Sequence, residues 1–261
     1  MKLTRWPTIA VNKAWENRPR RVERSDRRRL ERVLDAYADY DEVFVHVGLS
    51  DVNAAFDGNP YELLVDALTD AFDSVLAPGF TDYFRESGVF DRQHSKPMHG
   101  TFSTLLLEEA DYRTSDPCKS ILVAGEYRFD GCTHRDTFAA DGCFQRLYED
   151  DVLVVAIGTP HWKCSYLHHL EAKYDAPYSV ERTIEGVVHD DGEATEIEQR
   201  TNYYDSIFWT FNKLKLQRDL DAAGVLESYD LNGLGVYVTP IRELDRFVGR
   251  EMAADPYYLV T

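Results

Sequence analysis

The chain has 261 residues, with 46 acidic against 29 basic side chains and a formal net charge of −17. A chain of this length can bury roughly three quarters of its unfolded surface, so one large domain is expected. The acidic balance argues against a nucleic-acid partner, which needs clustered Lys and Arg, and it favours a cationic ligand.

The sequence carries no sign of export or of membrane insertion. Its N-terminal segment contains no continuous apolar run, as a signal peptide would require. The longest apolar run, Val152–Gly158, is far shorter than the ~20 residues of a membrane span. We therefore expect a cytoplasmic protein with no membrane partner, and the evenly spread acidic residues are typical of a salty cytoplasm. The cysteines form no Cys-x-x-Cys pair and are expected to be reduced thiols: Cys118, Cys132, Cys143 and Cys164.

The start of the chain is predicted to be a charged helical extension, residues 1–40, ahead of a main domain of residues 41–261. Ser25 is the expected N-cap of an amphipathic helix in this extension. The arginines of residues 20–29 resemble a nucleic-acid patch, but acidic residues interrupt the run. A solvated helix is therefore the better interpretation.

Four short runs rich in Val, Ile and Leu predict buried strands. The first covers Val43–Val47, a helix begins near Pro60, and the second strand ends at Pro78. The other two runs are "KSILVAGEY" and "DVLVVAIGT", and Gly closes the apolar part of each. A strand, a helix and a strand at this spacing predict an α/β fold, with a mixed central sheet flanked by helices in a single compact domain.

After Tyr178 the pattern changes and predicts a C-terminal hairpin and helix. Alternating residues on both sides of Asp190-Asp191-Gly192 indicate two strands that turn at this point. A helix is expected to follow from about Ser206 to Ala223.

Functional side chains gather where the predicted strands end, and open α/β sheets hold their ligands at such edges. If Ser165 caps a short helix, His168 lies in its first turn and Glu171 lies three residues later on the same face. A helix N-terminus disfavours the imidazolium, so a neutral His168 could act as a general base. A buried, hydrogen-bonded histidine is an equally good interpretation of His168, and His169 is interpreted as structural.

Two other chemistries stay open at this stage. His134, His161 and His168 with the cysteines could form the zinc site of a hydrolase, but no spacing matches such a site, so no metal is predicted. Cys164 lies four residues before His168, and a thiolate beside a base could carry an acyl group. A free cysteine on a helix flank is more often a small apolar residue. The chain has no dinucleotide or P-loop motif.

Six segments follow one another along the chain: "VFVHVGLSDV", "LAPGFTDYFRESGVFDRQHSKPMHGTFSTLL", "YRTSDPCKSILVAG", "TFAADGCFQRLYEDDVLVVAIG", "SYLHHLE" and "DPYYLV". In this order and spacing they resemble the aminoglycoside 3-N-acetyltransferase family, from about Glu42 to the C-terminus. The "HSKPMHG" segment and the Asp116-Pro117 form of the third motif are most similar to the branch found in sugar and surface-glycan gene clusters.

The resemblance implies an N-acetyltransferase that uses acetyl-coenzyme A as cosubstrate. The implied acceptor is the primary amine of an amino sugar, which we take to be nucleotide-linked and biosynthetic. By this resemblance His168 deprotonates the amine directly and Glu171 is its acidic partner. The positions that match coenzyme-lining segments of the family are Ser50, Arg113, Thr114 and Ser120.

The chain also departs from the family pattern. Gly48 stands where a serine is usual, Ser165 replaces a threonine, and "DGCFQRL" lacks the Ser-Pro of the drug-modifying members. An aminoglycoside-modifying resistance enzyme is therefore the alternative within the family. From a different class, a non-catalytic homologue that binds coenzyme A or a sugar nucleotide also stays open, as does a homodimer.

Overall fold

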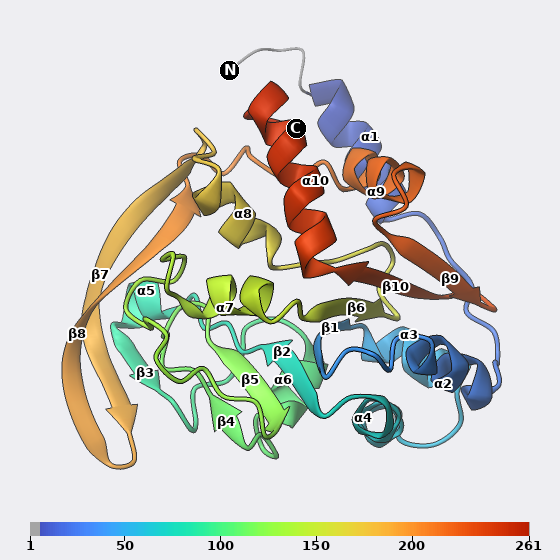
Figure 1. Ribbon diagram of the computed structural model, residues 1–261, viewed down its shortest axis with the longest axis horizontal. Helices are drawn as coiled ribbons and strands as arrows, with labels where there is room; N and C mark the ends of the chain where they lie inside the picture. Colours follow the sequence, from blue (N-terminus) through green and yellow to red (C-terminus); the bar gives the residue numbers. More distant parts are fainter. Residues whose placement is uncertain (1–5, 261) are drawn as a thin grey trace.

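Seven strands form the central sheet of the computed structural model, which describes residues 6–260 (Figure 1). They are β1 (Glu42–Val47), β2 (Ser74–Pro78), β4 (Tyr112–Arg113), β5 (Ile121–Gly125), β6 (Leu153–Ile157), β9 (Glu227–Leu231) and β10 (Leu234–Pro240). Their order across the sheet is β4-β5-β2-β1-β6-β10-β9. β1 runs parallel to β2 and β6, whereas every other neighbouring pair is antiparallel, so the sheet is mixed.

Helices cover both faces of this sheet (Figure 1). One face carries α2 (Arg27–Asp35), α3 (Leu49–Ala55), α4 (Pro60–Ala71) and α6 (Thr101–Leu106); the other carries α7 (Cys143–Glu149), α8 (Leu167–Lys173), α9 (Lys213–Ala222) and α10 (Ile241–Ala254). The side chains of a strand alternate between the two faces. In β1, Val43 and Val45 therefore join one core and Phe44 joins the other. The predicted fold class, a mixed central sheet flanked by helices in one domain, is confirmed.

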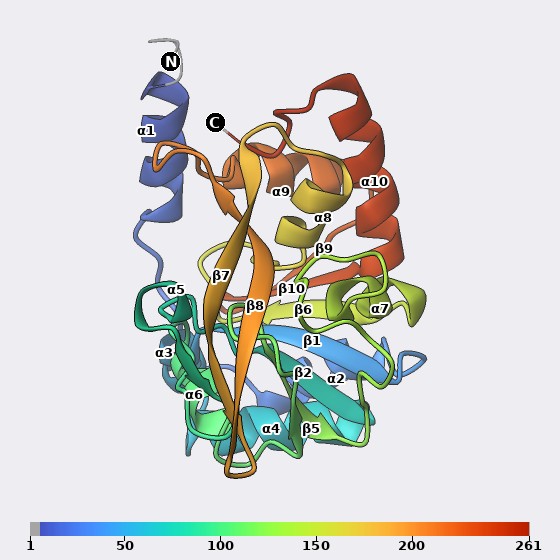
Figure 2. The same ribbon diagram turned by 90° about the vertical axis from the view of Figure 1, so that its left-hand side faces the viewer.

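A long hairpin adds a second, three-stranded sheet along one side of the molecule (Figure 2). Its strands are β7 (Ser179–Asp190) and β8 (Glu193–Tyr204), and β3 (Val89–Asp91), which follows α5 (Phe84–Ser87), runs parallel to β7. Asp191 and Gly192 turn the hairpin with φ of 49° and 84°. The predicted hairpin and its turn are confirmed.

Three predicted helix boundaries are wrong. Asp26, not Ser25, caps α2, because its carboxylate accepts a hydrogen bond from the backbone N–H of Arg28 at 3.0 Å. The helix expected from Ser206 begins only at Lys213, because the preceding Phe211 is extended and pairs with Val260. Ser165 does not cap α8 and makes a different contact, described below.

The N-terminal helix α1 (Trp6–Glu16) packs against α9, far along the chain. Asn12 makes this contact, since its amide donates to the carbonyl of Phe211 at 2.7 Å and its oxygen accepts from the backbone N–H of Leu214 at 3.0 Å. The boundary between residues 1–40 and 41–261 stays a prediction, and residues 1–5 of the extension lie outside the described part. Within residues 6–260, no helix combines the length and apolar character that crossing a membrane requires.

Candidate active site

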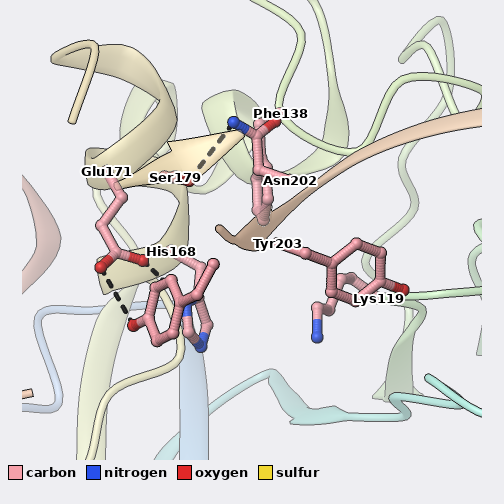
Figure 3. A pocket seen from close by; sticks show the side chains of 8 residues that line it. Lys119, Phe138, His168, Glu171, Ser179, Asn202 and Tyr203 are labelled. Carbon is pink, nitrogen blue, oxygen red and sulfur yellow. Dashed lines mark hydrogen bonds and ion pairs between the residues drawn. The ribbon is translucent and has the colours of Figure 1, made fainter. Parts of the chain in front are cut away.

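Two pockets meet at α8: an inner pocket between α8 and the paired ends of β7 and β8, and a cleft where β1 and β6 end and α8 begins. The inner pocket, of about 100 Å³, is lined by Phe138, Glu171, Ser179, Asn202, Tyr203 and Tyr204, together with Lys119 and His168 (Figure 3). The cleft, of about 300 Å³, includes Val45, His46, Val47, Thr159, Lys163 and Ser165 in its lining. Lys119 and His168 line both pockets. His168 can therefore contact a ligand bound in either pocket.

His168 belongs to a chain of hydrogen bonds that ends in the inner pocket (Figure 3). Its Nδ1 lies 2.9 Å from Oε2 of Glu171, and the hydroxyl of Tyr204 donates to Oε1 of Glu171 at 3.0 Å. A carboxylate in its ionised form only accepts, so the neutral tautomer of His168 that fits this contact donates from Nδ1 and has its lone pair on Nε2. The side chain of His168 is 32% exposed and that of Glu171 is 1% exposed.

The helical geometry of α8 explains the contact between His168 and Glu171, and the packing of β8 explains the contact of Tyr204. In α8, residues three positions apart lie on the same face, so Glu171 lies within hydrogen-bond reach of His168, as the spacing predicts. Tyr204 comes from the end of β8 and closes the carboxylate from the other side. Phe211 packs beside the imidazole, with ring centroids 5.2 Å apart. The ring of His168 is therefore held in one orientation.

His169 faces the core, away from both pockets. It is 1% exposed, and its ring stacks on Phe144 with centroids 6.3 Å apart. Burial lowers the pKa of His169 to about 4. These contacts are those of a structural residue.

His46, at the end of β1, holds the segment that leads into α8. Its Nε2 accepts a hydrogen bond from the backbone N–H of Ser165 at 2.9 Å, and the Ser165 hydroxyl lies at the same distance. Burial lowers the pKa of His46 to about 3, so the imidazole stays neutral. Ser165 thus fixes the approach to α8 through β1 and not through a helix cap.

Lys119 brings a positive charge to the border between the two pockets. Its ammonium lies 2.6 and 2.8 Å from the two carboxylate oxygens of Asp82 and 4.8 Å from the ring centre of Phe80. Asp116, which is 3% exposed, fixes the backbone of Cys118 and Lys119 by accepting both N–H groups at 2.7 and 2.9 Å. The position of this cation is therefore set by the half-buried Asp82 and by the buried Phe80 and Asp116.

Three of the four expected coenzyme residues are buried and bonded to the protein itself. Arg113 is 4% exposed and donates to Ser120 Oγ at 3.0 Å and to carbonyl oxygens of Gly79, Arg92 and Ser95 at 2.7 to 3.1 Å. Burial lowers its pKa to about 10. Thr114 and Ser120 are fully buried, and Thr114 Oγ1 accepts from the N–H of Ile121.

These side chains can therefore shape the loops around the cleft, whereas a direct contact with a ligand would require their hydrogen bonds to change. Ser50, the fourth expected residue, is exposed in the first turn of α3 and lines neither pocket.

Gly48, one of the expected departures from the family pattern, lies at a close crossing of two strand ends. A Cβ at this position would lie 2.2 Å from the carbonyl oxygen of Gly158, which itself has a φ of +69°. A side chain at position 48 would force the β1 and β6 turns apart. Glycine at position 48 thus has a local steric reason.

Cys164 does not have the surroundings of a nucleophile. It is 7% exposed and lines neither pocket, and burial raises its pKa to about 12. The thiol is therefore kept in its neutral form.

Among residues 6–260, no group of three or more His, Cys, Asp or Glu side chains is placed to hold a metal ion.

Sequence reasoning missed several residues of the site, among them His46, Asp82, Lys119, Lys163, Asn202 and Tyr204. His46, Asp82 and Lys119 lie inside the segments that carry the family resemblance, so their position could have suggested them. Tyr204 gave no local signal, because it lies 33 residues from the glutamate it contacts.

Comparisons with known proteins agree with this architecture. AAC-IIIb in its binary complex with CoASH has a TM-score of 0.70 and 18% identity, covering 88% of this chain and 97% of that one. Aminoglycoside acetyltransferase AAC(3)-Xa has a TM-score of 0.69 and 18% identity, covering 97% and 98%. AAC-VIa bound to sisomicin has a TM-score of 0.69 and 17% identity, covering 88% and 98%.

At these identities the solved structures establish the shared fold. No curated protein matches the chain. The family model described as aminoglycoside 3-N-acetyltransferase matches residues 44–253, which is most of the chain. The chain therefore belongs to the aminoglycoside 3-N-acetyltransferase family.

Proposed function

We propose that this protein transfers an acetyl group from acetyl-coenzyme A to the primary amine of an amino sugar, with His168 as the general base. Family membership supports the reaction class, and the complex of AAC-IIIb with CoASH supports the donor. The observation that carries the residue assignment is the hydrogen-bonded series Tyr204–Glu171–His168, which ends at the border of two pockets.

In this proposal the acceptor reacts as its neutral amine, and Nε2 of His168 takes the proton that the nitrogen loses as it attacks the thioester carbon. The tetrahedral intermediate then collapses as the C–S bond breaks. The imidazolium returns its proton to the departing thiolate, so the base is restored and the products are the amide and coenzyme A. Glu171 stabilises the imidazolium while it exists, and general-base help of this kind is worth about 10²–10⁴ in rate.

The acceptor that we propose carries few positive charges, as a nucleotide-linked amino sugar does. Among the described residues that line the two pockets, the acids are Asp82 and Glu171. Asp82 already pairs with Lys119, and Glu171 with His168 and Tyr204. An aminoglycoside with several ammonium groups would find no spare carboxylate there, and leaving such charges unpaired is costly.

The test is coenzyme A release, followed with a thiol reagent, on a panel of amines. His168→Ala should abolish turnover while coenzyme A binding persists, and His94→Ala, which removes an exposed imidazole outside both pockets, should leave turnover unchanged. Retained turnover in His168→Ala would remove this residue from the proposed role. A protein that binds acetyl-coenzyme A but never releases thiol with any amine would favour the non-catalytic alternative.

The same panel separates the two acceptor classes. A nucleotide-linked amino sugar should give a higher kcat/KM than a polycationic aminoglycoside such as sisomicin. The opposite ranking, together with a steep loss of aminoglycoside turnover at higher salt, would favour the resistance enzyme.

A further inference from the structure

A concentration of positive charge lies beside the cleft, in a protein whose net charge is −17. Lys163 lines the cleft, and within the described chain its ammonium has no ion pair. Lys213 and Lys13 share one carboxylate, that of Glu16, at 3.4 and 3.0 Å, so this trio keeps a net positive charge. Arg18 extends the group on the side of α1.

Packing of the N-terminal segment brings these cations together. The ring of Trp15 lies 5.2 Å from that of His161, and the Arg18 guanidinium lies over the Trp15 ring at 4.6 Å. Arg18 donates to the carbonyl of Trp15 and makes no ion pair among residues 6–260. A segment outside the family match thus adds a cation beside the Thr159–Lys163 loop.

Arg20 ties the same segment to the edge of the cleft. It donates to the carbonyl of Thr159 at 3.1 Å and forms an ion pair with Asp51 of α3. Thr159 itself lines the cleft and donates to the carbonyl of His161 at 2.7 Å. The positive group is therefore fixed to the loop that leads from β6 toward His168.

His161 lies under this group with both ring nitrogens lacking a hydrogen-bond partner in the described structure, although it is only 3% exposed. Burial, with Lys213, Lys163 and Arg18 nearby, lowers the pKa of His161 to about 3. Burial, with Lys213 nearby, also lowers the pKa of Lys163. The cations therefore repel one another, and this repulsion is relieved when an anion binds among them.

We infer that Lys163, Arg18 and Lys213 form a subsite for the phosphates of a nucleoside diphosphate. Lys and Arg side chains are the usual partners of phosphate, with Arg able to bind in a bidentate manner. The inference rests on the proposed function, since both substrates of that reaction carry this chemistry: coenzyme A contains a phosphorylated adenosine diphosphate, and a nucleotide-linked sugar carries a diphosphate. Lys163 lines the same cleft as His168, and this connects the subsite to the proposed base.

The first test measures binding of adenosine diphosphate to the full chain by titration calorimetry, without any turnover. Lys163→Gln and Arg18→Gln should each weaken binding about tenfold, the loss expected for one charge-assisted contact. Arg246→Gln removes a charge from the exposed face of α10, outside both pockets, and should change nothing. Higher salt should narrow the difference between wild type and Lys163→Gln.

The second test identifies the source of the phosphates by steady-state kinetics. If the coenzyme occupies the subsite, Lys163→Gln raises KM for acetyl-coenzyme A but leaves S-acetylpantetheine unaffected. If the acceptor occupies it, the KM of the nucleotide-linked sugar rises and that of the free amino sugar does not. Wild type that fails to bind adenosine diphosphate, or equal losses in Lys163→Gln and Arg246→Gln, would overturn the subsite. An inactive protein that still binds adenosine diphosphate through Lys163 would overturn the proposed function alone.

Discussion

Replacing Glu171 with Gln would test the role of its charge, because glutamine keeps the size of the side chain and an oxygen that can accept the Nδ1 proton of His168. The carboxylate oxygen lies 2.9 Å from Nδ1, which puts the two charge centres about 4 Å apart when the imidazolium forms. At an effective dielectric constant of about 20, this attraction is about 4 kcal/mol. The expected result is a fall in kcat of about 10²–10³.

The assay is coenzyme A release under saturating acetyl-coenzyme A, with circular dichroism and thermal melting to show that the variant folds. Tyr204→Phe is the graded control, because it removes only the hydroxyl that donates to Oε1 at 3.0 Å. It should lower kcat about tenfold, the value of a hydrogen bond to a charged group. A Glu171→Gln variant that keeps more than about a fifth of the wild-type kcat would refute the charge argument.

Three further predictions concern groups whose burial sets their behaviour. Cys164→Ala should keep wild-type turnover, because burial raises the pKa of this thiol to about 12; radioactive acetyl trapped on Cys164 of the wild type would contradict this. Arg113→Lys should lose about 3 kcal/mol of unfolding free energy in urea, because an ammonium cannot reproduce the four hydrogen bonds of the guanidinium; unchanged stability with a raised KM for acetyl-coenzyme A would instead indicate a direct ligand contact. The pKa of His161 is lowered to about 3 from 6.5, so the unfolded chain takes the proton first and stability is lost as pH falls below 6.5. His161→Gln should remove about 2 kcal/mol of the stability loss between pH 7 and pH 5. An unchanged pH dependence of stability in this variant would rule out the buried neutral state.

Much of the fold followed from local pattern. Val43 to Val47 alternates between two cores, and Pro60 begins α4 at the position where its missing N–H costs nothing. Helix ends were less certain, because the choice between Ser25 and Asp26 as a cap depends on a difference of one residue. The extended pairing of Phe211 with Val260 could not be seen locally, because 49 residues separate the two.

The contacts of the site likewise fall into local ones, which the sequence predicts, and long-range ones, which it does not. The helical repeat is enough to bring His168 and Glu171 together, because residues three apart in a helix lie on one face. The Tyr204 hydroxyl, the Asp82 partner of Lys119 and the His46 partner of Ser165 come from 33, 37 and 119 residues away. Each of these contacts depends on how the hairpin, the strand ends and the loops pack together. No short segment of the sequence predicts that packing.

The sequence by itself determined the four buried strands, the hairpin, the acidic balance and the pairing within α8, because these depend on composition and on contacts within a few residues. The tertiary structure alone decided that Arg113, Thr114 and Ser120 are buried among protein hydrogen bonds and that Arg18 of the extension reaches His161 through the ring of Trp15. The physical reason is that burial and net local charge arise from segments distant in the chain. Both quantities are set only when those segments pack together.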